Sequence, residues 1–199
     1  MKAAVRLPVL VVVLSLAAVT VGGAQAPSPS PAAGPNPFSA LVKASFDVVA
    51  RYLVGSAEKM PEENYAFKPT PEVRSFAEIL GHVANTHYNY CSRIKGEKNP
   101  NEGNDLEKKT AKADLVKALK DSIDYCSAVY ADMTDAKALE PLPAAPAPAA
   151  SPKPAGGPPA PPRFRLLLGN VTHDQEHYGN LVTYLRLKGL VPPSSEPRR

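Results

Sequence analysis

The chain has 199 residues, a formal net charge of +4 at pH 7 and 44% hydrophobic residues, which is enough for one domain or at most two. Its two cysteines exclude a disulfide-dense scaffold and a zinc site made of four cysteines. Lys and Arg residues are scattered along polar helix faces and form no basic stripe with aromatic residues, so we expect no nucleic-acid partner. The sequence contains neither a phosphate-binding glycine loop nor a nucleophile elbow.

The first 26 residues have the pattern of a signal peptide. Lys2 and Arg6 precede an apolar run from Leu7 to Val21, and Ala24-Gln25-Ala26 then fits a cleavage site. The run is shorter than the roughly 18–20 residues that span a membrane. We expect cleavage after Ala26, which gives a periplasmic or secreted protein with no stable membrane insertion. The alternative is an uncleaved N-terminal anchor.

Two segments contain too much proline to pack in a core. Residues 27–36 read as a Pro/Ser/Ala-rich tether. Residues 141–162 contain ten prolines among 22 residues. Because proline lacks an N–H donor and disrupts a helix interior, we predict that this second segment is a disordered surface insertion. A long insertion adds little closure entropy, so the fold can tolerate it.

Apolar residues recur at helical spacing in four segments of the remaining sequence. These segments are residues 37–59, 75–95, 111–133 and 163–188. Ser75 and Glu78 have the spacing of a capping box at the start of the second segment. No segment shows the alternation that is typical of a strand. Four amphipathic helices of about 20 residues bury a common core best as a four-helix bundle, so we predict an all-α fold.

The two cysteines bear on the direction of the second and third predicted helices. Cys91 and Cys126 each lie about 15 residues into their helix, so they stand at the same height if the helices are parallel. In an antiparallel pair they would be offset by roughly 15 Å, which is beyond the reach of a disulfide. The linker of residues 96–110 is long enough to cross the bundle and allow parallel helices. The alternative to a disulfide is two separate buried thiols.

All four histidines fall on two of the predicted helices. His173 and His177 are spaced i, i+4, which places both rings on one side of a helix where they can chelate one divalent ion. Such a pair alone is also common among ordinary core and surface histidines. His82 lies on the flank of the second helix and His87 lies nearer the middle of its apolar side. The helical wheel does not decide between them as third ligand, but a mid-face histidine more often supports a ligand or bonds within the core.

Two parts of the sequence resemble the DinB (damage-inducible) superfamily. The first part is MPEENYAFKPTP at residues 60–71, followed by SFAEILGHVA at residues 75–84. The second part is HDQEHY at residues 173–178, followed by YLRLKG at residues 184–189 and two prolines at 192–193. As a combination, these phrases are fairly specific to the family.

The resemblance extends over residues 37–194, apart from the proline-rich insertion. It implies an up-down-down-up four-helix bundle with a crossover between helices two and three. The metal ligands of the family are one histidine on helix two and an HxxxH pair on helix four. By residue match, the resemblance implies His82, His173 and His177 as these ligands.

The resemblance also implies a class of function. Some members are thiol-dependent S-transferases or isomerases, and others are described as metal-dependent hydrolases. We therefore expect an exported, divalent-metal-dependent hydrolase or thiol transferase that acts on a small-molecule substrate as a monomer or homodimer. The candidate ions are Zn, Ni, Fe and Mn, and three imidazoles leave positions on the ion open. The alternatives are a non-catalytic metal- or small-ligand-binding stress protein, and an interaction module that uses the proline-rich insertion.

Four further residues are candidates for the surroundings of the metal. Glu176 lies between the HxxxH ligands in sequence and is the candidate catalytic acid or base. His87, Asn85 and Tyr184 are candidate supporting or pocket residues. Export argues against a simple transfer of the family's thiol chemistry, because thiol cofactors of the cytosol are scarce in an oxidising compartment.

Overall fold

The computed structural model describes residues 34–144 and 159–197, and within these ranges the fold is all helical. Its four long helices are α1 (Pro37–Lys59), α2 (Phe76–Lys95), α3 (Lys112–Ala131) and α5 (Arg163–Leu187). The shorter helices are α4 (Asp135–Leu139) and the single 3-10 turns η1 (Glu62–Asn64), η2 (Leu106–Lys108) and η3 (Pro193–Ser195). The predicted all-α fold is confirmed. The predicted signal peptide and the middle of the insertion, residues 145–158, lie outside the described residues.

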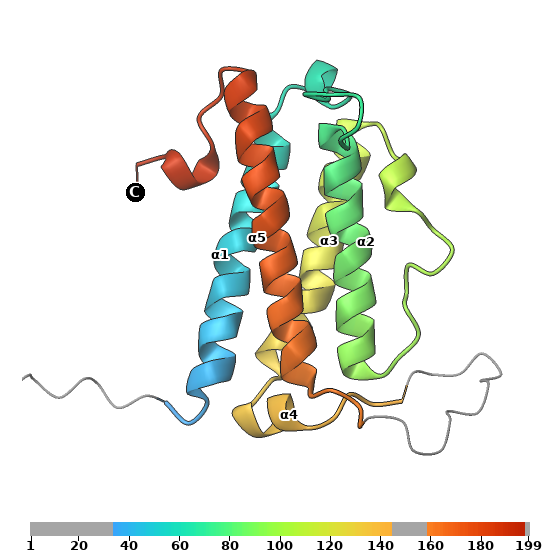
Figure 1. Cartoon of the computed structure of the whole chain (residues 1–199), viewed down its shortest axis with the longest axis vertical. Coiled ribbons are helices and arrows are strands. Elements are labelled where there is room, and N and C mark those ends of the chain that lie inside the picture. The colour runs from blue at the N-terminus through green and yellow to red at the C-terminus, as the bar shows by residue number, and fades with distance from the viewer. Residues whose placement is uncertain (1–33, 145–158, 198–199) are drawn as a thin grey trace, which may run out of the picture. The chain divides into compact units, whose positions relative to one another are not determined.

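The helices α2 and α3 run in the same direction (Figure 1). His87 on α2 contacts Ser122 on α3, and Cys91 is bonded to Cys126 four residues further along both helices. The chain between them returns along the outside of the bundle and forms η2 on the way (Figure 1). The crossover therefore brings η2 against α2, which matters for the histidines described below.

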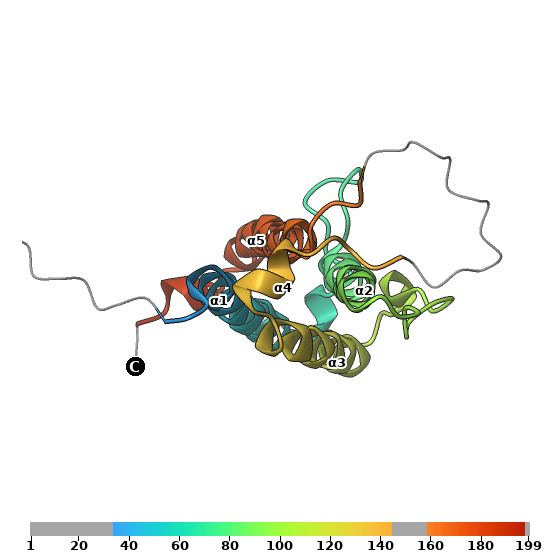
Figure 2. The same cartoon turned by 90° about the horizontal axis from the view of Figure 1, so that it is seen from below.

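The helix α5 runs antiparallel to α2. Arg163 at the start of α5 donates a hydrogen bond to the carbonyl of Ile94 near the end of α2. The ring centroid of Tyr184 near the end of α5 lies 6.5 Å from that of Phe76 at the start of α2. Viewed along the bundle, α1 and α2 lie at opposite corners, with α3 and α5 between them (Figure 2). Within the described ranges, no helix is both long and apolar enough to cross a membrane.

The helix α2 begins at a capping box. The Ser75 hydroxyl accepts a hydrogen bond from the Glu78 backbone N–H, and the Glu78 carboxylate accepts one from the Ser75 N–H. These bonds satisfy two of the backbone donors that a helix start leaves without partners. Gly96 ends the helix in the left-handed conformation with φ of 74°. The predicted capping box is confirmed, and it fixes the register of the helix that carries His82 and His87.

The short helix α4 was not predicted from the sequence. Its first residue, Asp135, accepts hydrogen bonds from the backbone N–H groups of Phe38 and Ser39. Asn36 at the cap position of α1 uses its side chain to accept a bond from the Asp135 N–H instead of capping its own helix. The start of α1 is therefore capped by a residue almost one hundred positions away.

The ends of the predicted insertion are paired with each other. The Leu142 N–H donates to the carbonyl of Pro161, and the Arg163 N–H donates to the carbonyl of Glu140. The side chain of Leu142 is partly buried against the bundle. The first and last residues of the predicted insertion are therefore joined by backbone hydrogen bonds next to the start of α5, rather than unpacked as predicted.

The core consists of two large apolar clusters along the bundle axis and a small third one formed by Ala84, Leu106 and Ala118. One large cluster includes Leu53 and Phe76 and lies where α2 begins, and the other includes Phe46 and Ile94 and lies where α2 ends. Between the two large clusters lies a layer of buried polar side chains from α2, α3 and α5, namely His87, Ser122 and Asp174. Buried polar groups need partners, so this layer constrains how the three helices meet.

Candidate metal centre

Three histidines from two helices lie together beside the polar layer. His173 and His177 stand one turn apart on α5, and the antiparallel α2 brings His82 against them. Each offers one ring nitrogen, and these atoms all lie within 4.8 Å of one another. The closest pair is Nε2 of His82 and Nε2 of His173, which are 3.1 Å apart. The ring centroid of His82 lies 5.0 Å from that of His173 and 4.8 Å from that of His177.

Outer partners hold the rings of two of these histidines at Nδ1. Nδ1 of His82 lies 2.8 Å from Oε1 of Glu107, a residue of η2. Nδ1 of His177 lies 3.4 Å from the side-chain amide of Asn180. The carboxylate of Glu107 accepts from Nδ1 of His82, which leaves Nε2 of that ring available for an ion, as is usual for metal-bound histidines. The amide of Asn180 instead donates toward Nδ1 of His177, so this contact does not hold a proton on that nitrogen.

The third histidine, His173, is backed by a buried carboxylate. Its Nδ1 is buried and has no hydrogen-bond partner among the described residues, and Oδ1 of Asp174 lies 3.8 Å away. Burial opposes ionisation of Asp174, but His87 and His173 outweigh it and hold the pKa of Asp174 below its ordinary value. A buried carboxylate beside an orphaned ring nitrogen is an environment that suits a histidine bound to a cation.

His87 belongs to the core and supports Asp174. Its Nε2 lies 3.0 Å from both carboxylate oxygens of Asp174, and its Nδ1 lies 2.9 Å from the hydroxyl of Ser122. Ser122 already donates its own proton to the carbonyl of Leu119, so it accepts from His87. His87 and Asp174 therefore form a buried hydrogen-bonded pair that joins α2 to α5. The structure brings His82, and not His87, to the HxxxH pair.

Burial favours the neutral form of two of the clustered histidines. It lowers the pKa of His82, with the charge of Arg74 adding to the effect and the hydrogen bond to Glu107 opposing it. Burial and the neighbouring imidazoles of His173 and His82 lower the pKa of His177 to about 4. A neutral imidazole has the free lone pair that a metal ion needs.

The cluster lies at a seam between α2 and α5 that is open to solvent. The side chain of His82 is 23% exposed and that of His173 is 18% exposed, whereas His177 is buried. An ion held here would therefore have one side toward the protein and one side toward water.

Among the other residues named from the sequence, Asn85 and Tyr184 hold backbone near the cluster. Asn85 accepts a hydrogen bond from the Leu106 N–H in the crossover. Tyr184 donates one to the carbonyl of Arg74, at 2.5 Å. Glu176 is exposed on α5 and makes no hydrogen bond or ion pair with the described residues, so the structure does not bring it into the cluster.

Sequence reasoning missed Glu107, Arg74 and Asp174. Arg74 donates from Nε to Oε2 of Glu107 at 3.0 Å, so both oxygens of that carboxylate are engaged. The position of Asp174 next to His173 in sequence was a usable signal, because a charged residue on the inner side of a helix needs a partner. Glu107 and Arg74 gave no such signal, since each lies outside the long helices.

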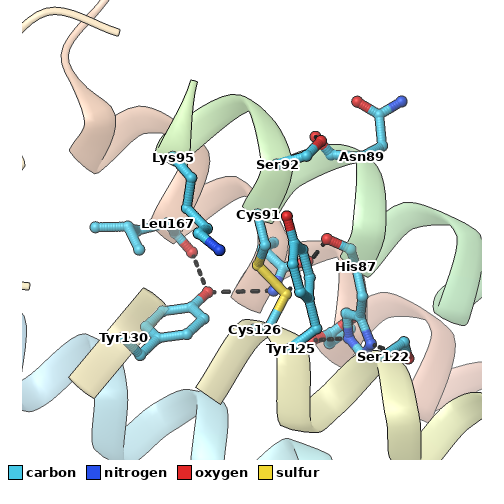
Figure 3. Close-up of a disulfide and its surroundings, with 12 residues drawn as sticks. His87, Asn89, Cys91, Ser92, Lys95, Ser122, Tyr125, Cys126, Tyr130 and Leu167 are labelled. Atoms are coloured by element: carbon cyan, nitrogen blue, oxygen red, sulfur yellow. Dashed lines mark hydrogen bonds and ion pairs between the residues drawn. A yellow bond between two sulfur atoms is a disulfide. The ribbon is translucent and has the colours of Figure 1, made fainter. Parts of the chain in front are cut away.

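A disulfide clamps α2 to α3 next to the polar layer (Figure 3). Cys91 and Cys126 are bonded with their Cα atoms 5.5 Å apart, which lies within the usual range for disulfides. Figure 3 shows the bond one turn away from His87 and Ser122. The alternative of two separate thiols does not hold in this structure. The bond fixes the position of α2 along the bundle axis relative to α3, one turn from the point where His87 enters the core.

An all-helical bundle with three histidines from two antiparallel helices defines a candidate metal-binding protein of the helical-bundle class. Residues 45–181 match the sequence model of the DinB superfamily. The chain belongs to the DinB superfamily, as the sequence phrases indicated. None of the curated proteins matches the chain.

Two solved structures share this fold. A DinB-like protein from Bacillus cereus ATCC 10987 is 14% identical, with a TM-score of 0.59 over 76% of this chain and 93% of that chain. A conserved protein from Enterococcus faecalis is 15% identical, with a TM-score of 0.57 over 75% of this chain and 96% of that chain. At these identities the likeness establishes the fold alone.

Proposed function

We propose that His82, His173 and His177 bind one divalent metal ion and that the protein is a metal-dependent hydrolase or thiol transferase for a small-molecule substrate. The observation that carries the proposal is the convergence of three ring nitrogens within 4.8 Å. Membership of the DinB superfamily supports it.

The chemistry of the donor set fits such an ion. Two nitrogens that bind one ion at about 2.1 Å cannot lie more than about 4.2 Å apart. The Nε2 atoms of His82 and His173 meet this limit at 3.1 Å, whereas separations in the full set of three nitrogens reach 4.8 Å, so a ring must turn slightly toward the ion for all three to bind it. Their Nδ1 atoms face the carboxylates of Glu107 and Asp174, at 2.8 Å and 3.8 Å. When bound, a divalent ion with open positions lowers the pKa of a water or thiol ligand and polarises a substrate carbonyl.

The protein contributes orientation and access to this chemistry. The exposed edges of His82 and His173 leave the solvent side of the seam for a substrate. The buried pair of His87 and Asp174 holds the inner side rigid.

We also propose that the protein acts outside the cytoplasm. The signal-peptide pattern of residues 1–26 supports this. The disulfide between Cys91 and Cys126 supports it independently, because disulfides persist in oxidising compartments. Thiol cofactors of the cytosol are scarce there, which favours the hydrolase over the thiol transferase.

The test is a metal titration of the chain after removal of bound ions with a chelator. We expect about one Zn²⁺ or Ni²⁺ per chain, and a loss of binding in His82→Ala and His173→Ala. Asn89→Ala on α2 and Gln175→Ala on α5 are matched controls, because both side chains are exposed. His87→Ala is a poor control, since it leaves Asp174 buried without its partner.

Two results would contradict the proposal at different levels. Failure of the folded wild-type chain to bind any divalent ion would overturn the metal site. Binding of one ion without turnover of ester, amide or thiol substrates would support the alternative, a non-catalytic metal-binding protein. Ion content and turnover are therefore measured on the same samples.

A further inference from the structure

We propose that Glu107 is the positioning residue of the candidate metal centre: it holds the ring of His82 so that Nε2 points to the HxxxH pair. This inference rests on the proposed function in that the ring is positioned for a metal ion. The contact itself exists without the ion, so it can be tested separately.

The contact between Glu107 and His82 sets which ring nitrogen carries the proton. Oε1 of Glu107 lies 2.8 Å from Nδ1 of His82, and a carboxylate at this distance accepts a hydrogen bond. In the neutral ring the proton then sits on Nδ1, and the lone pair is on Nε2. That nitrogen faces His173 at 3.1 Å. A carboxylate behind a ligand also increases the basicity of the nitrogen that binds the metal.

The carboxylate of Glu107 is itself held in place. Oε2 accepts a hydrogen bond from Nε of Arg74 at 3.0 Å, so each oxygen has its own partner. The carbonyl of Arg74 accepts the hydroxyl proton of Tyr184, which anchors this part of the chain to α5. The side chain of Glu107 is only 29% exposed. Two fixed oxygens define the plane of the carboxylate, and this plane restricts the rotation of the His82 ring.

The crossover is fitted to α2 at the residues around His82. At Gly81 a Cβ atom would lie 2.3 Å from the carbonyl oxygen of Leu106, so only glycine allows this approach of the two backbones. One turn later, the Asn85 side chain accepts a hydrogen bond from the Leu106 N–H at 3.1 Å. Leu106 is 3% exposed and packs in a small cluster with Ala84. These contacts fix the backbone of η2 directly before Glu107.

The same contacts explain how Asn85 and Tyr184, which the sequence predicted near the metal, act on the site. Asn85 acts on the crossover, and Tyr184 acts on Arg74; neither has a hydrogen bond to the three histidines within the described ranges. Both therefore act on His82 through Glu107. The second carboxylate, Asp174, backs His173 from inside the core, so the two histidines are supported by carboxylates from different elements.

The test combines zinc affinity with the protonation pattern of the His82 ring. Zn²⁺ affinity is measured by competition with a chromophoric chelator for wild type, Glu107→Ala and Glu107→Gln. We expect a 10- to 100-fold loss for the alanine variant and a smaller loss for the glutamine variant, whose amide oxygen can still accept from Nδ1. The matched control is Glu102→Gln, also in the crossover, whose carboxylate is 61% exposed and pairs with Lys98.

The second readout uses the metal-free protein. Long-range ¹H–¹⁵N spectra of the histidine rings report which nitrogen carries the proton. We expect His82 to be protonated at Nδ1 in wild type and to become a mixture of tautomers in Glu107→Ala, with an unchanged helical content by circular dichroism.

The two readouts separate the failure of this inference from the failure of the proposed function. If wild type binds Zn²⁺ and Glu107→Ala binds it equally well, the positioning role is overturned and the metal site stands. If wild type binds no ion, the proposed function fails, and the spectra still decide whether Glu107 orients His82. A His82 ring with the same tautomer in both proteins would overturn the positioning role in either case.

Discussion

His87 and Asp174 form a hydrogen-bonded pair with no exposure to solvent, with Nε2 of the ring 3.0 Å from both carboxylate oxygens. The pair joins α2 to α5 in the polar layer between two apolar clusters. Its carboxylate lies beside Nδ1 of His173, one of the three clustered histidines. The polar layer of the core and the candidate metal centre are therefore neighbours, and Asp174 lies between them.

Removal of one partner of this pair should be costly. His87→Leu leaves the Asp174 carboxylate buried without compensation, so we expect a loss of about 3–5 kcal/mol in the free energy of unfolding. Asp174→Asn keeps an acceptor for His87 and should cost less. Urea unfolding monitored by circular dichroism measures both. The double variant His87→Leu/Asp174→Leu should lose less than the sum of the single leucine variants, and a strictly additive result would argue against coupling.

The disulfide should contribute to stability through the unfolded chain. Cys91 and Cys126 are separated by 35 positions, and closure of a loop of that length stabilises a fold by about 4 kcal/mol in the chain-entropy model. We expect the double variant Cys91→Ala/Cys126→Ala to unfold at a correspondingly lower urea concentration. Dithiothreitol should lower the stability of wild type and leave the double variant unchanged. Equal stability of wild type with and without reductant would contradict this prediction.

Two glycine-to-alanine substitutions should have opposite effects. Gly81→Ala forces the backbone of the crossover away from α2, since its Cβ would lie 2.3 Å from the Leu106 oxygen, and we expect a loss of about 1–3 kcal/mol. Gly179→Ala on α5 meets no atom within 4 Å and replaces a helical glycine, so we expect a gain of about 0.5–1 kcal/mol. Thermal unfolding compares the two. A stabilised Gly81→Ala variant would show that the close approach is absent.

The capping box of α2 should make the free energy of unfolding depend on pH in the acidic range. The hydrogen bond from the Ser75 backbone and the bond and charge of Lys68 lower the pKa of Glu78 to about 2 in the folded state, from 4.5. A carboxyl group whose pKa is lowered in the folded state stabilises the fold at pH values above its unfolded-state pKa of 4.5. This contribution is lost as the pH falls from about 4.5 to 2. We expect Glu78→Gln to be less stable than wild type by about 0.5–1 kcal/mol at pH 6.

The difference between the two proteins should shrink as the pH falls. Urea unfolding of wild type and Glu78→Gln at pH 6, 4 and 2.5 measures this difference. The glutamine amide does not titrate, and all other groups titrate alike in the two proteins, so a change in the difference with pH reports on Glu78. A difference that stays constant from pH 6 to pH 2.5 would show that the carboxylate charge plays no part in the cap.

Features set by local sequence were predictable. The four long helices follow from apolar spacing and end within a few residues of the predicted bounds. The spacing of His173 and His177 places both on one side of α5 without knowledge of any other element. The two cysteines were predictable as a disulfide only on the condition that α2 and α3 run in parallel. The structure meets this condition.

Features set by packing between distant segments were not predictable. A helical wheel gives the side of a helix on which His82 and His87 lie, but the choice between them depends on which neighbour covers each side. The contact of Glu107 with His82 depends on the path of the crossover and on the close approach at Gly81. The helix α4 is five residues long, which is too short for a periodic pattern to reveal.

The most direct test of the account is a crystal of the protein grown with Zn²⁺ and measured at the zinc absorption edge. We expect one anomalous peak per chain, about 2.0–2.1 Å from a ring nitrogen of each of His82, His173 and His177. The peak should disappear in crystals of His173→Ala. A wild-type crystal with these three rings in place and zinc bound only elsewhere would contradict the assignment of this cluster as the metal centre.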